Sequence, residues 1–199
     1  ARPVVLDRNG AWEAVLENAY DIIVTGEING EDTLSFKIPY RDGKRGYIDS
    51  EKKIQIVDDM YKVRTVTDTR DTDGSAVTEV YAEAEFYDLT FSVRKEERTF
   101  EAEYPETAMA YALEGTEWSV GTVTVRTQRT WTSTEKNALS ILRNIADLHG
   151  GDLVFDCPNR LVHLLTVNGR DSGALFAYKK NMKSIERIVD TRSLVTRLY

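Results

Sequence analysis

Residues 18–39 read NAYDIIVTGEINGEDTLSFKIP and predict two strands joined by a turn. The first strand is the mostly apolar run 20–26, and the turn after it contains Asn29-Gly30, a dipeptide that hairpins favour. In the second strand, 33–38, apolar and polar residues alternate, so its three apolar side chains share one face. Pro39 has no N–H to donate and ends the pairing. The stretch therefore predicts a β-hairpin with one buried face.

The rest of the first half also predicts strands. Residues 53–57 and 61–67 flank Asp58-Asp59 and predict a second pair. The longest expected strand covers 75–87. Short strands at roughly 10–15-residue spacing, separated by turns, are typical of an antiparallel barrel or sandwich. Residues 11–18 are too short a run to decide between a helical turn and a strand.

The second half changes to helical spacing. Pro105 in the first turn and Gly115 past the end predict a short helix over 107–113. A strand rich in threonine and valine is expected over 121–129. The change of period places a domain boundary near residue 92.

A longer helix is expected after Thr132-Ser133-Thr134-Glu135, which fits a capping box. Gly150-Gly151 ends this helix. Its predicted apolar stripe consists of Ala138, Ile141, Leu142, Ile145 and Leu148. Residues 153–157 and 161–167 then predict a hairpin, and 175–178 a further short strand.

The composition excludes several classes of protein. The chain has 199 residues, of which 41% are apolar, and this excludes a disordered chain. Its 26 basic and 33 acidic residues give a net charge of −7, which disfavours a dedicated nucleic-acid binder. The single cysteine, Cys157, excludes a disulfide framework and a cysteine-based zinc site. No apolar run approaches the ~20 residues that cross a bilayer, and we expect neither a membrane span nor a secretory signal.

The two histidines, His149 and His163, define the first candidate site. Four further potential ligands or nucleophiles lie near them in the sequence: Asp147, Asp152, Asp156 and Cys157. Such groups bind metal ions or form Cys–His nucleophile pairs. At the end of a predicted helix, however, His149 also suits the helix dipole as a cation, and His163 lies within a predicted strand. The spacing matches no known motif, and we expect no catalytic or metal-binding residue here.

A row of acids on the long strand forms the second candidate. Alternation places five side chains on one face: Glu79, Tyr81, Glu83, Glu85 and Tyr87. Three carboxylates in a row are suited to binding a cation or to acid–base chemistry. The interleaved tyrosines suit a subunit interface or the wall of a passage equally well. A solvated face is the remaining alternative.

Two weaker patterns remain. Asp68, Asp71 and Asp73, in DTRDTDG, resemble part of a calcium loop, but Glu79 lies at the wrong offset to close it, which favours an aspartate-rich turn. The chain has three tryptophans, a residue type that stacks on sugars: Trp12, Trp118 and Trp131. We expect Trp118 in the core or an interface, and Trp131 as a hydrophobic staple beside the helix cap. Near the end, Arg192 and Arg197 are too few to form a basic patch.

Several short sequence motifs, taken in order along the chain, carry a family resemblance. They are NAYD (18–21), GED (30–32), LSF (34–36), IP (38–39), VYAE (80–83), LEGTEW (113–118), NMKSIER (181–187), VDT (189–191) and VTRL (195–198). Their order and spacing resemble the N-terminal part of phage minor structural proteins, also called tail-associated lysins or prophage tail endopeptidases. The likeness covers nearly the whole chain.

The resemblance implies the α+β fold of the baseplate hub of contractile-tailed phages. An antiparallel β-barrel-like domain would occupy 1–92, a mixed α/β domain 93–190, and the truncated start of a second barrel 191–199. The implied role is structural, in the tail tip or baseplate of the virion, after synthesis in the cytoplasm of the bacterial host. Any lytic domain of the family would lie downstream, so the resemblance implies no enzyme activity, no cofactor and no metal.

The implied partners follow from the same resemblance. The full-length protein would be a homotrimer that forms a ring around the DNA path, next to the distal tail protein ring and the tape-measure protein. DNA would pass through without specific binding, and no membrane would be contacted. Two other functions stay open: a cell-wall-degrading tail peptidase or hydrolase, and a carbohydrate-binding module.

Overall fold

The computed structural model describes residues 1–57, 59–70, 72, 74–94, 96–134, 137–169 and 173. Chain contacts divide the protein into two units, Ala1–Asn168 and Gly169–Tyr199, and every described helix and strand belongs to the first. The predicted strand 175–178 and the predicted barrel start 191–199 lie outside the described residues. Within the described residues, no helix combines the length and apolarity needed to cross a membrane.

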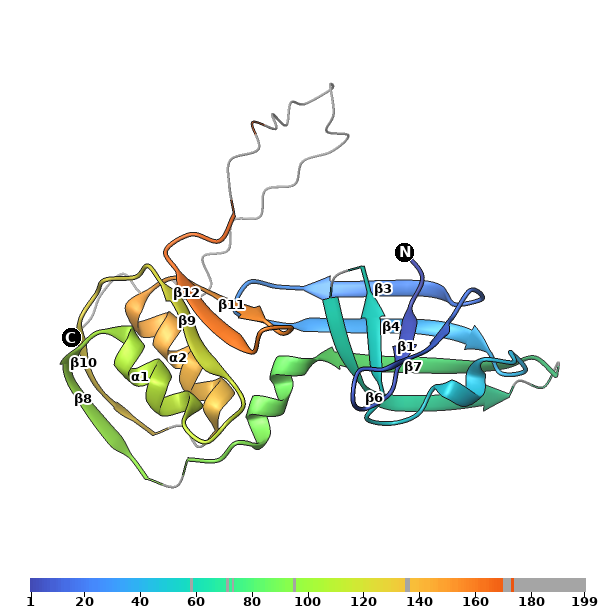
Figure 1. The fold of residues 1–199 in the computed structure, drawn as a ribbon, viewed down its shortest axis with the longest axis horizontal. Coiled ribbons are helices and arrows are strands. Elements are labelled where there is room, and N and C mark those ends of the chain that lie inside the picture. Colours follow the sequence, from blue (N-terminus) through green and yellow to red (C-terminus); the bar gives the residue numbers. More distant parts are fainter. Residues whose placement is uncertain are drawn as a thin grey trace, which may run out of the picture. The chain divides into compact units, whose positions relative to one another are not determined.

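Seven strands of the first half form one antiparallel sheet (Figure 1). They are β1 (Val4–Leu6), β2 (Trp12–Val15), β3 (Tyr20–Gly26), β4 (Asp32–Pro39), β5 (Lys53–Ile56), β6 (Asp59–Arg70) and β7 (Ala76–Ala84). A short 3-10 helix, η1 (Arg45–Tyr47), lies between β4 and β5. The spatial order is β2-β1-β5-β6-β7-β4-β3, which makes β2 and β3 the two edges.

The connection between the two edges shows why this sheet is curled. β2 and β3 lie at opposite edges, yet they are consecutive in the chain and joined by residues 16–19. An extended chain spans at most about 3.6 Å per residue, so the end of β2 lies within about 18 Å of the start of β3. The sheet must therefore bend toward itself. It is a curled half-barrel, and in the described part of the chain β2 and β3 do not pair with each other.

The predicted hairpin at 18–39 is confirmed as β3 and β4. The Glu27 N–H donates to the Glu31 carbonyl at 2.7 Å and closes the turn. The alternation in β4 works as expected, since its three apolar side chains, Leu34, Phe36 and Ile38, are buried. The predicted pair around residues 58–59 is also confirmed, as β5 and β6, and the undecided stretch 11–18 contains the strand β2.

The predicted long strand 75–87 is wrong at its end. β7 stops at Ala84, and Glu85–Phe91 forms a 3-10 helix, η2. Phe86 and Leu89 are both buried, and a spacing of three residues matches the turn of a 3-10 helix. Turning at residue 85 thus buries both side chains, which an extended strand would have placed on opposite faces.

The second half combines two helices with two small sheets. Its elements are β8 (Arg98–Glu103), α1 (Pro105–Leu113), β9 (Ser119–Val123), β10 (Arg129–Ser133), α2 (Ala138–His149), β11 (Asp152–Asp156) and β12 (Leu161–Leu165). β10 pairs with β8, and the other sheet has the order β11-β12-β9, in which β12 and β9 are parallel. The predicted helix after Pro105 and the predicted hairpin of β11 and β12 are confirmed.

The predicted strand 121–129 is divided in the structure. β9 ends at Val123 and β10 begins at Arg129. Between them the chain packs against the end of α2, where the Thr127 hydroxyl donates to the His149 carbonyl at 2.9 Å. This contact draws the chain away from the sheet.

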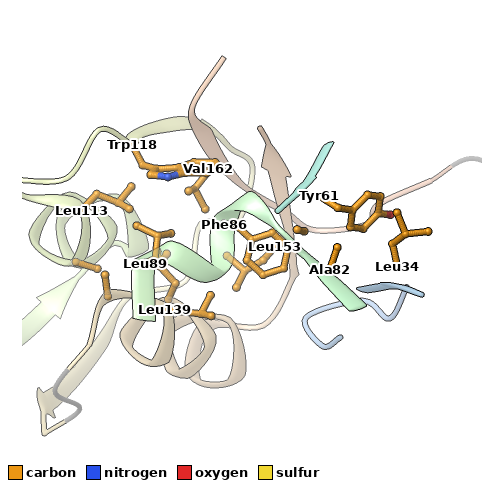
Figure 2. Packing of buried hydrophobic residues seen from close by; sticks show 14 of the residues in the cluster. Leu34, Tyr61, Ala82, Phe86, Leu89, Leu113, Trp118, Leu139, Leu153 and Val162 are labelled. Carbon is orange, nitrogen blue, oxygen red and sulfur yellow. The ribbon is translucent and has the colours of Figure 1, made fainter. Parts of the chain in front are cut away.

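One cluster of buried apolar side chains runs from the half-barrel into the second half (Figure 2). Phe86 and Leu89 of η2 lie in its middle, with Tyr61 on the side of the sheet and Leu113 on the side of the helices. The 3-10 helix η2 therefore does more than connect the two halves. Its apolar side chains are part of the core that they share.

The start of α2 differs from the predicted capping box. Asn137 is the N-cap, and its side-chain oxygen accepts a hydrogen bond from the Ser140 N–H at 2.9 Å. Thr132 and Ser133 belong to β10 instead, while Glu135 lies outside the described residues. The apolar stripe is shifted accordingly. Leu148 is exposed, and three residues absent from the predicted stripe are buried: Leu139, Ala146 and His149.

Replacement of Asn137 by alanine is expected to lower the free energy of unfolding by about 1 kcal/mol, because the cap hydrogen bond is lost. The matched control is Thr132→Ala, which removes the predicted cap and only an exposed hydroxyl contact with Thr99. It should change stability by less than about 0.5 kcal/mol. Urea denaturation followed by circular dichroism measures both, and a larger effect at Thr132 would contradict this assignment.

Candidate functional site

The two histidines occupy separate hydrogen-bonded positions. His149 is buried at the end of α2, where its Nδ1 donates to the Thr127 carbonyl at 3.0 Å. His163, in β12, accepts a hydrogen bond at Nδ1 from the Thr122 N–H at 2.8 Å. The described residues contain no group of three or more His, Cys, Asp or Glu side chains that could bind a metal ion. Both histidines therefore have structural contacts of their own.

The predicted role of His149 as a helix-end cation is wrong. Burial lowers the pKa of His149 below its ordinary value of 6.5, and the nearby Arg129 acts in the same direction. The hydrogen bond to the Thr127 carbonyl opposes this shift but does not outweigh it. Protonation would also place an N–H at Nε2, a buried atom without a hydrogen-bond partner in the described structure. The imidazole is neutral at pH 7.

This lowered pKa predicts a pH dependence of stability. The unfolded state takes up the proton first as the pH falls through about 6.5, so the free energy of unfolding decreases there and is fully retained above it. We expect wild-type protein to be less stable at about pH 5.5 than at about pH 7.5, and His149→Gln to show a smaller difference. Urea denaturation at the two pH values measures this, and equal pH dependence in both proteins would contradict it.

The other members of this candidate site are also accounted for. Burial raises the pKa of the Cys157 thiol to about 11, so it is not a thiolate nucleophile at neutral pH. Asp156 accepts hydrogen bonds from Asn159, which lower the pKa of the carboxyl. Asp152 accepts the N–H of Asn168 at 2.8 Å, and Asp147 is exposed on α2. The structure does not bring these side chains together as a reactive group.

The three glutamates of the predicted row pair with different basic residues. Glu79 pairs with Lys37 at 3.3 Å, and Glu83 pairs with Arg64 at 3.1 Å. The prediction is wrong for Glu85 and Tyr87, because both belong to η2 and not to the strand. Tyr81 keeps its predicted place, and its hydroxyl donates to Glu83 at 3.4 Å.

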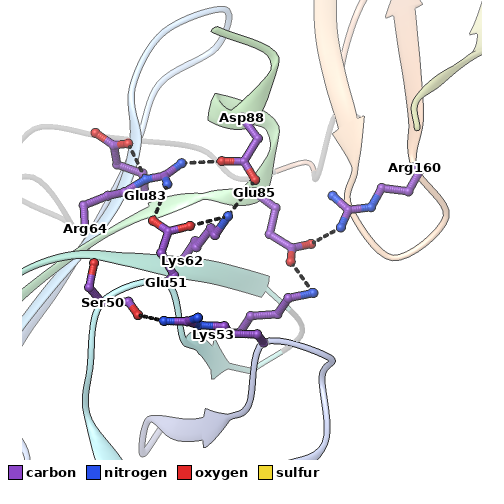
Figure 3. Close-up of polar contacts among 10 residues, drawn as sticks. Ser50, Glu51, Lys53, Lys62, Arg64, Glu83, Glu85, Asp88 and Arg160 are labelled. Carbon is purple, nitrogen blue, oxygen red and sulfur yellow. Dashed lines mark hydrogen bonds and ion pairs between the residues drawn. The ribbon is translucent and has the colours of Figure 1, made fainter. Parts of the chain in front are cut away.

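Glu85 is a buried carboxylate between two basic residues (Figure 3). Its side chain is 6% exposed and contacts Lys53 of β5 at 2.7 Å. On its other side Arg160, from the turn between β11 and β12, approaches at 3.4 Å. The carboxylate thus connects the half-barrel to the three-stranded sheet β11-β12-β9.

A neighbouring ion-pair network was not predicted from the sequence (Figure 3). Lys62 and Arg64 of β6 both contact Glu51 and Asp88. Burial alone would raise the pKa of Asp88, but the hydrogen bonds from Arg64 and Lys62 outweigh it and the pKa is lowered. The pKa of Glu51 is lowered by its hydrogen bond with Lys62. Every carboxylate of this network is neutralised by a base, which makes it a structural cluster.

The aspartate-rich turn is only partly described. Asp68 accepts hydrogen bonds from Arg45 at 2.7 Å and from the Thr78 hydroxyl at 2.6 Å, and the pKa of its carboxyl is lowered by these contacts. Asp71 and Asp73 lie outside the described residues. Asp68 is therefore engaged in contacts with η1 and with the neighbouring strand β7.

The three tryptophans have different environments. Trp118 is buried, as predicted, and meets Phe155 edge-on with ring centroids 6.0 Å apart. Trp131 stacks on Phe100 across the β8–β10 pair at 5.0 Å, so the predicted staple beside the helix cap is wrong. Trp12 is exposed on β2. Of the three, only Trp12 presents a largely free ring surface.

Comparisons with known proteins define the class to which this fold belongs. The family model for the prophage endopeptidase tail N-terminal domain matches residues 3–84, and the model for the prophage endopeptidase tail domain matches 92–164. This is a phage tail protein. The chain belongs to the prophage endopeptidase tail family and corresponds to its N-terminal part, as the sequence motifs predict. No curated protein matches it in sequence.

Solved structures share the fold at low sequence identity. Prophage tail protein gp18 from Listeria monocytogenes has 15% identity and a TM-score of 0.76 over 98% of this chain. A tail protein from Neisseria meningitidis has 14% identity and a TM-score of 0.59 over 98%, and the 43 kDa tail protein of prophage MuSo2 from Shewanella oneidensis has 11% and 0.63 over 92%. The chain spans 60%, 61% and 60% of their respective lengths.

Proposed function

We propose that this chain is a structural part of a phage tail tip or baseplate hub. In the full-length protein, three copies would form a ring around the path of the DNA. The observation that carries the proposal is the likeness in fold to tail proteins over 92–98% of the chain, together with the family match. We also propose the domain order of the hub fold for this protein: a barrel-like domain at 1–92, a mixed domain at 93–190 and a second barrel from 191.

The net charge of the chain favours a channel through which DNA passes over a surface that binds DNA. A net charge of −7 repels a polyanion, so DNA would pass without specific contact. The proposed neighbours are the distal tail protein ring on one side and the end of the tape-measure protein within. The proposed location is the tail tip of the virion, with assembly in the host cytoplasm.

The test is sizing chromatography and electron microscopy of the full-length protein, alone and with the distal tail protein. We expect a ring of three copies that stacks on the distal tail ring. A protein that stays monomeric in the presence of that partner would contradict the proposal.

A non-catalytic role is part of the same proposal, although the family name includes an endopeptidase. The contacts of the candidate residues support it, because Glu79, Glu83 and Glu85 are all paired with bases. Incubation of the chain with purified peptidoglycan should release no soluble fragments. Cleavage would support the hydrolase alternative, and tight retention on intact cell walls would support the carbohydrate-binding one.

A further inference from the structure

The edge strand β3 is apolar and exposed. Ile23 and Val24 are exposed, as is Ile28 in the turn that follows. Exposed edges are usually protected by lysines, prolines, bulges or short length, because unpaired strands recruit other strands. β3 has an irregular register between Tyr20 and Ile23, but from Ile23 to Gly26 it pairs regularly with β4. This regular part carries no protecting charge.

The apolar core of the half-barrel is uncovered at this edge. Val24 lies opposite Leu34 in the hairpin, and residues directly opposite each other share a face of the sheet. Leu34 is completely buried, whereas Val24 is 48% exposed. Each inner strand of the sheet has a neighbouring strand on both sides, whereas in the described structure β3 has one only on the side of β4. The core-facing side chains of β3 are therefore left partly exposed.

The backbone at this edge is available for pairing. Glu27 and Glu31 form a hydrogen-bonded pair, and hydrogen-bonded and non-bonded pairs alternate along an antiparallel ladder. The N–H and C=O groups of Val24 and Gly26 accordingly point away from β4. In the described part of the chain, β4 is the only strand that pairs with β3. Two residues thus offer four free backbone groups to a further strand.

Two other edge strands, β2 and β11, are covered by side chains. At β2, which is only four residues long, Lys44 donates to the Val15 carbonyl at 2.9 Å. At β11, the Asn29 amide donates to the Gly151 carbonyl at 3.0 Å and accepts the Leu153 N–H at 2.6 Å. Asn29 takes the place of a partner strand there. β3 has no comparable cover among the described residues.

The charges around β3 indicate what kind of strand fits. Three exposed acids lie on β3 or in the turn after it: Asp21, Glu27 and Glu31. A fourth, Glu79, lies on β7, with β4 between it and β3. Lys37 is shared between Asp21 at 3.7 Å and Glu79 at 3.3 Å, and Arg143 is held by the Gly30 carbonyl and the Tyr87 ring. Pairing with the same edge of a second copy would bring two acidic borders together. We infer that β3 docks an extended strand of another protein, with apolar residues on its core-facing side and basic residues on its outer side.

The assay uses the isolated chain and two blocked peptides. The first is Arg-Val-Thr-Val-Arg-Val-Thr, which places its valines on one face and its arginines on the other. In the control peptide, glutamate replaces both arginines. Titration followed by NMR should perturb the amides of Val24 and Gly26, with the arginine peptide binding about tenfold tighter at low salt. High salt should reduce this difference.

Two variants test the location. Val24→Lys should weaken binding of the arginine peptide at least about tenfold, because it adds a charge at the docking edge. The matched control is Val57→Lys, an exposed valine outside β3, which should leave the affinity unchanged. Circular dichroism verifies that both variants fold. If Val24→Lys does not fold, Val24→Pro, which removes the edge N–H, takes its place.

Several outcomes would overturn the inference. These are no binding at millimolar peptide, equal binding of both peptides, perturbations that map away from β3, or equal effects of the two lysine variants. Perturbation of the same amides by protein concentration alone would identify a second copy as the occupant and refute a basic partner. None of these outcomes depends on ring formation, since the assay contains only this chain.

Discussion

Replacement of Phe86 by alanine is expected to lower the free energy of unfolding by about 3–5 kcal/mol. The Phe86 side chain is 4% exposed and lies between two other rings, with centroids 4.0 Å from Phe155 and 4.7 Å from Tyr87. Its loss removes apolar burial and leaves a cavity where η2 meets β11. Because Phe86 is in the middle of the shared core, the two halves should be destabilised together (Figure 2).

The control for this prediction is in the same short helix. Phe91 is 74% exposed, and its ring centroid lies 5.8 Å from the guanidinium of Arg64. Phe91→Ala should cost about 0.5–1 kcal/mol. Urea denaturation, monitored by tryptophan fluorescence and circular dichroism, compares the two. Similar losses for Phe86→Ala and Phe91→Ala would show that η2 does not connect the halves as the structure indicates.

The sequence predicted those elements whose signals are local. The hairpin of β3 and β4 has both an alternating strand and an Asn-Gly turn, and each signal acts within a few residues. The same applies to α1, where proline at the first turn and Gly115 after the last mark the two ends. The order of the strands in the sheet could not be predicted in this way, because no local sequence pattern shows that β2 and β3 lie at opposite edges of one sheet.

Wrong predictions arose where a distant contact prevailed over a local motif. Two residues of the predicted capping box, Thr132 and Ser133, belong to β10, where Trp131 stacks on Phe100 and the Thr132 hydroxyl contacts Thr99. The alternation that predicts a strand to residue 87 is broken because η2 buries Phe86 against Phe155. Propensity is a weak term, and packing against residues far along the chain outweighs it.

The candidate site shows the same limit. Spacing placed three glutamates on one strand face, but it could not reveal their partners. The bases that neutralise Glu85 come from β5 and from the turn after β11, both far from it in sequence. The sequence also could not predict that β3 is an exposed edge strand, because an apolar strand has the same sequence pattern at the centre and at the edge of a sheet. Family resemblance, which uses the order of motifs along the chain, identified the class where local chemistry did not.

Replacement of Glu85 by glutamine is expected to lower the free energy of unfolding by about 2–3 kcal/mol. The change keeps the shape of the side chain but removes the charge between Lys53 and Arg160. Breaking a buried ion pair is costly because the remaining charges stay buried without compensation. The expected loss is at the low end of the usual range, since Lys53 and Arg160 retain some contact with water.

Glu79→Gln is the matched control, because its partner Lys37 is much more exposed and surface pairs contribute at most about 1 kcal/mol. Added salt should reduce the effect at Glu79 and have little influence at Glu85. A double-mutant cycle with Lys53→Met isolates the pair, and a coupling energy of at least about 1 kcal/mol is expected. If the two changes are additive, the ion pair between Lys53 and Glu85 contributes nothing to stability.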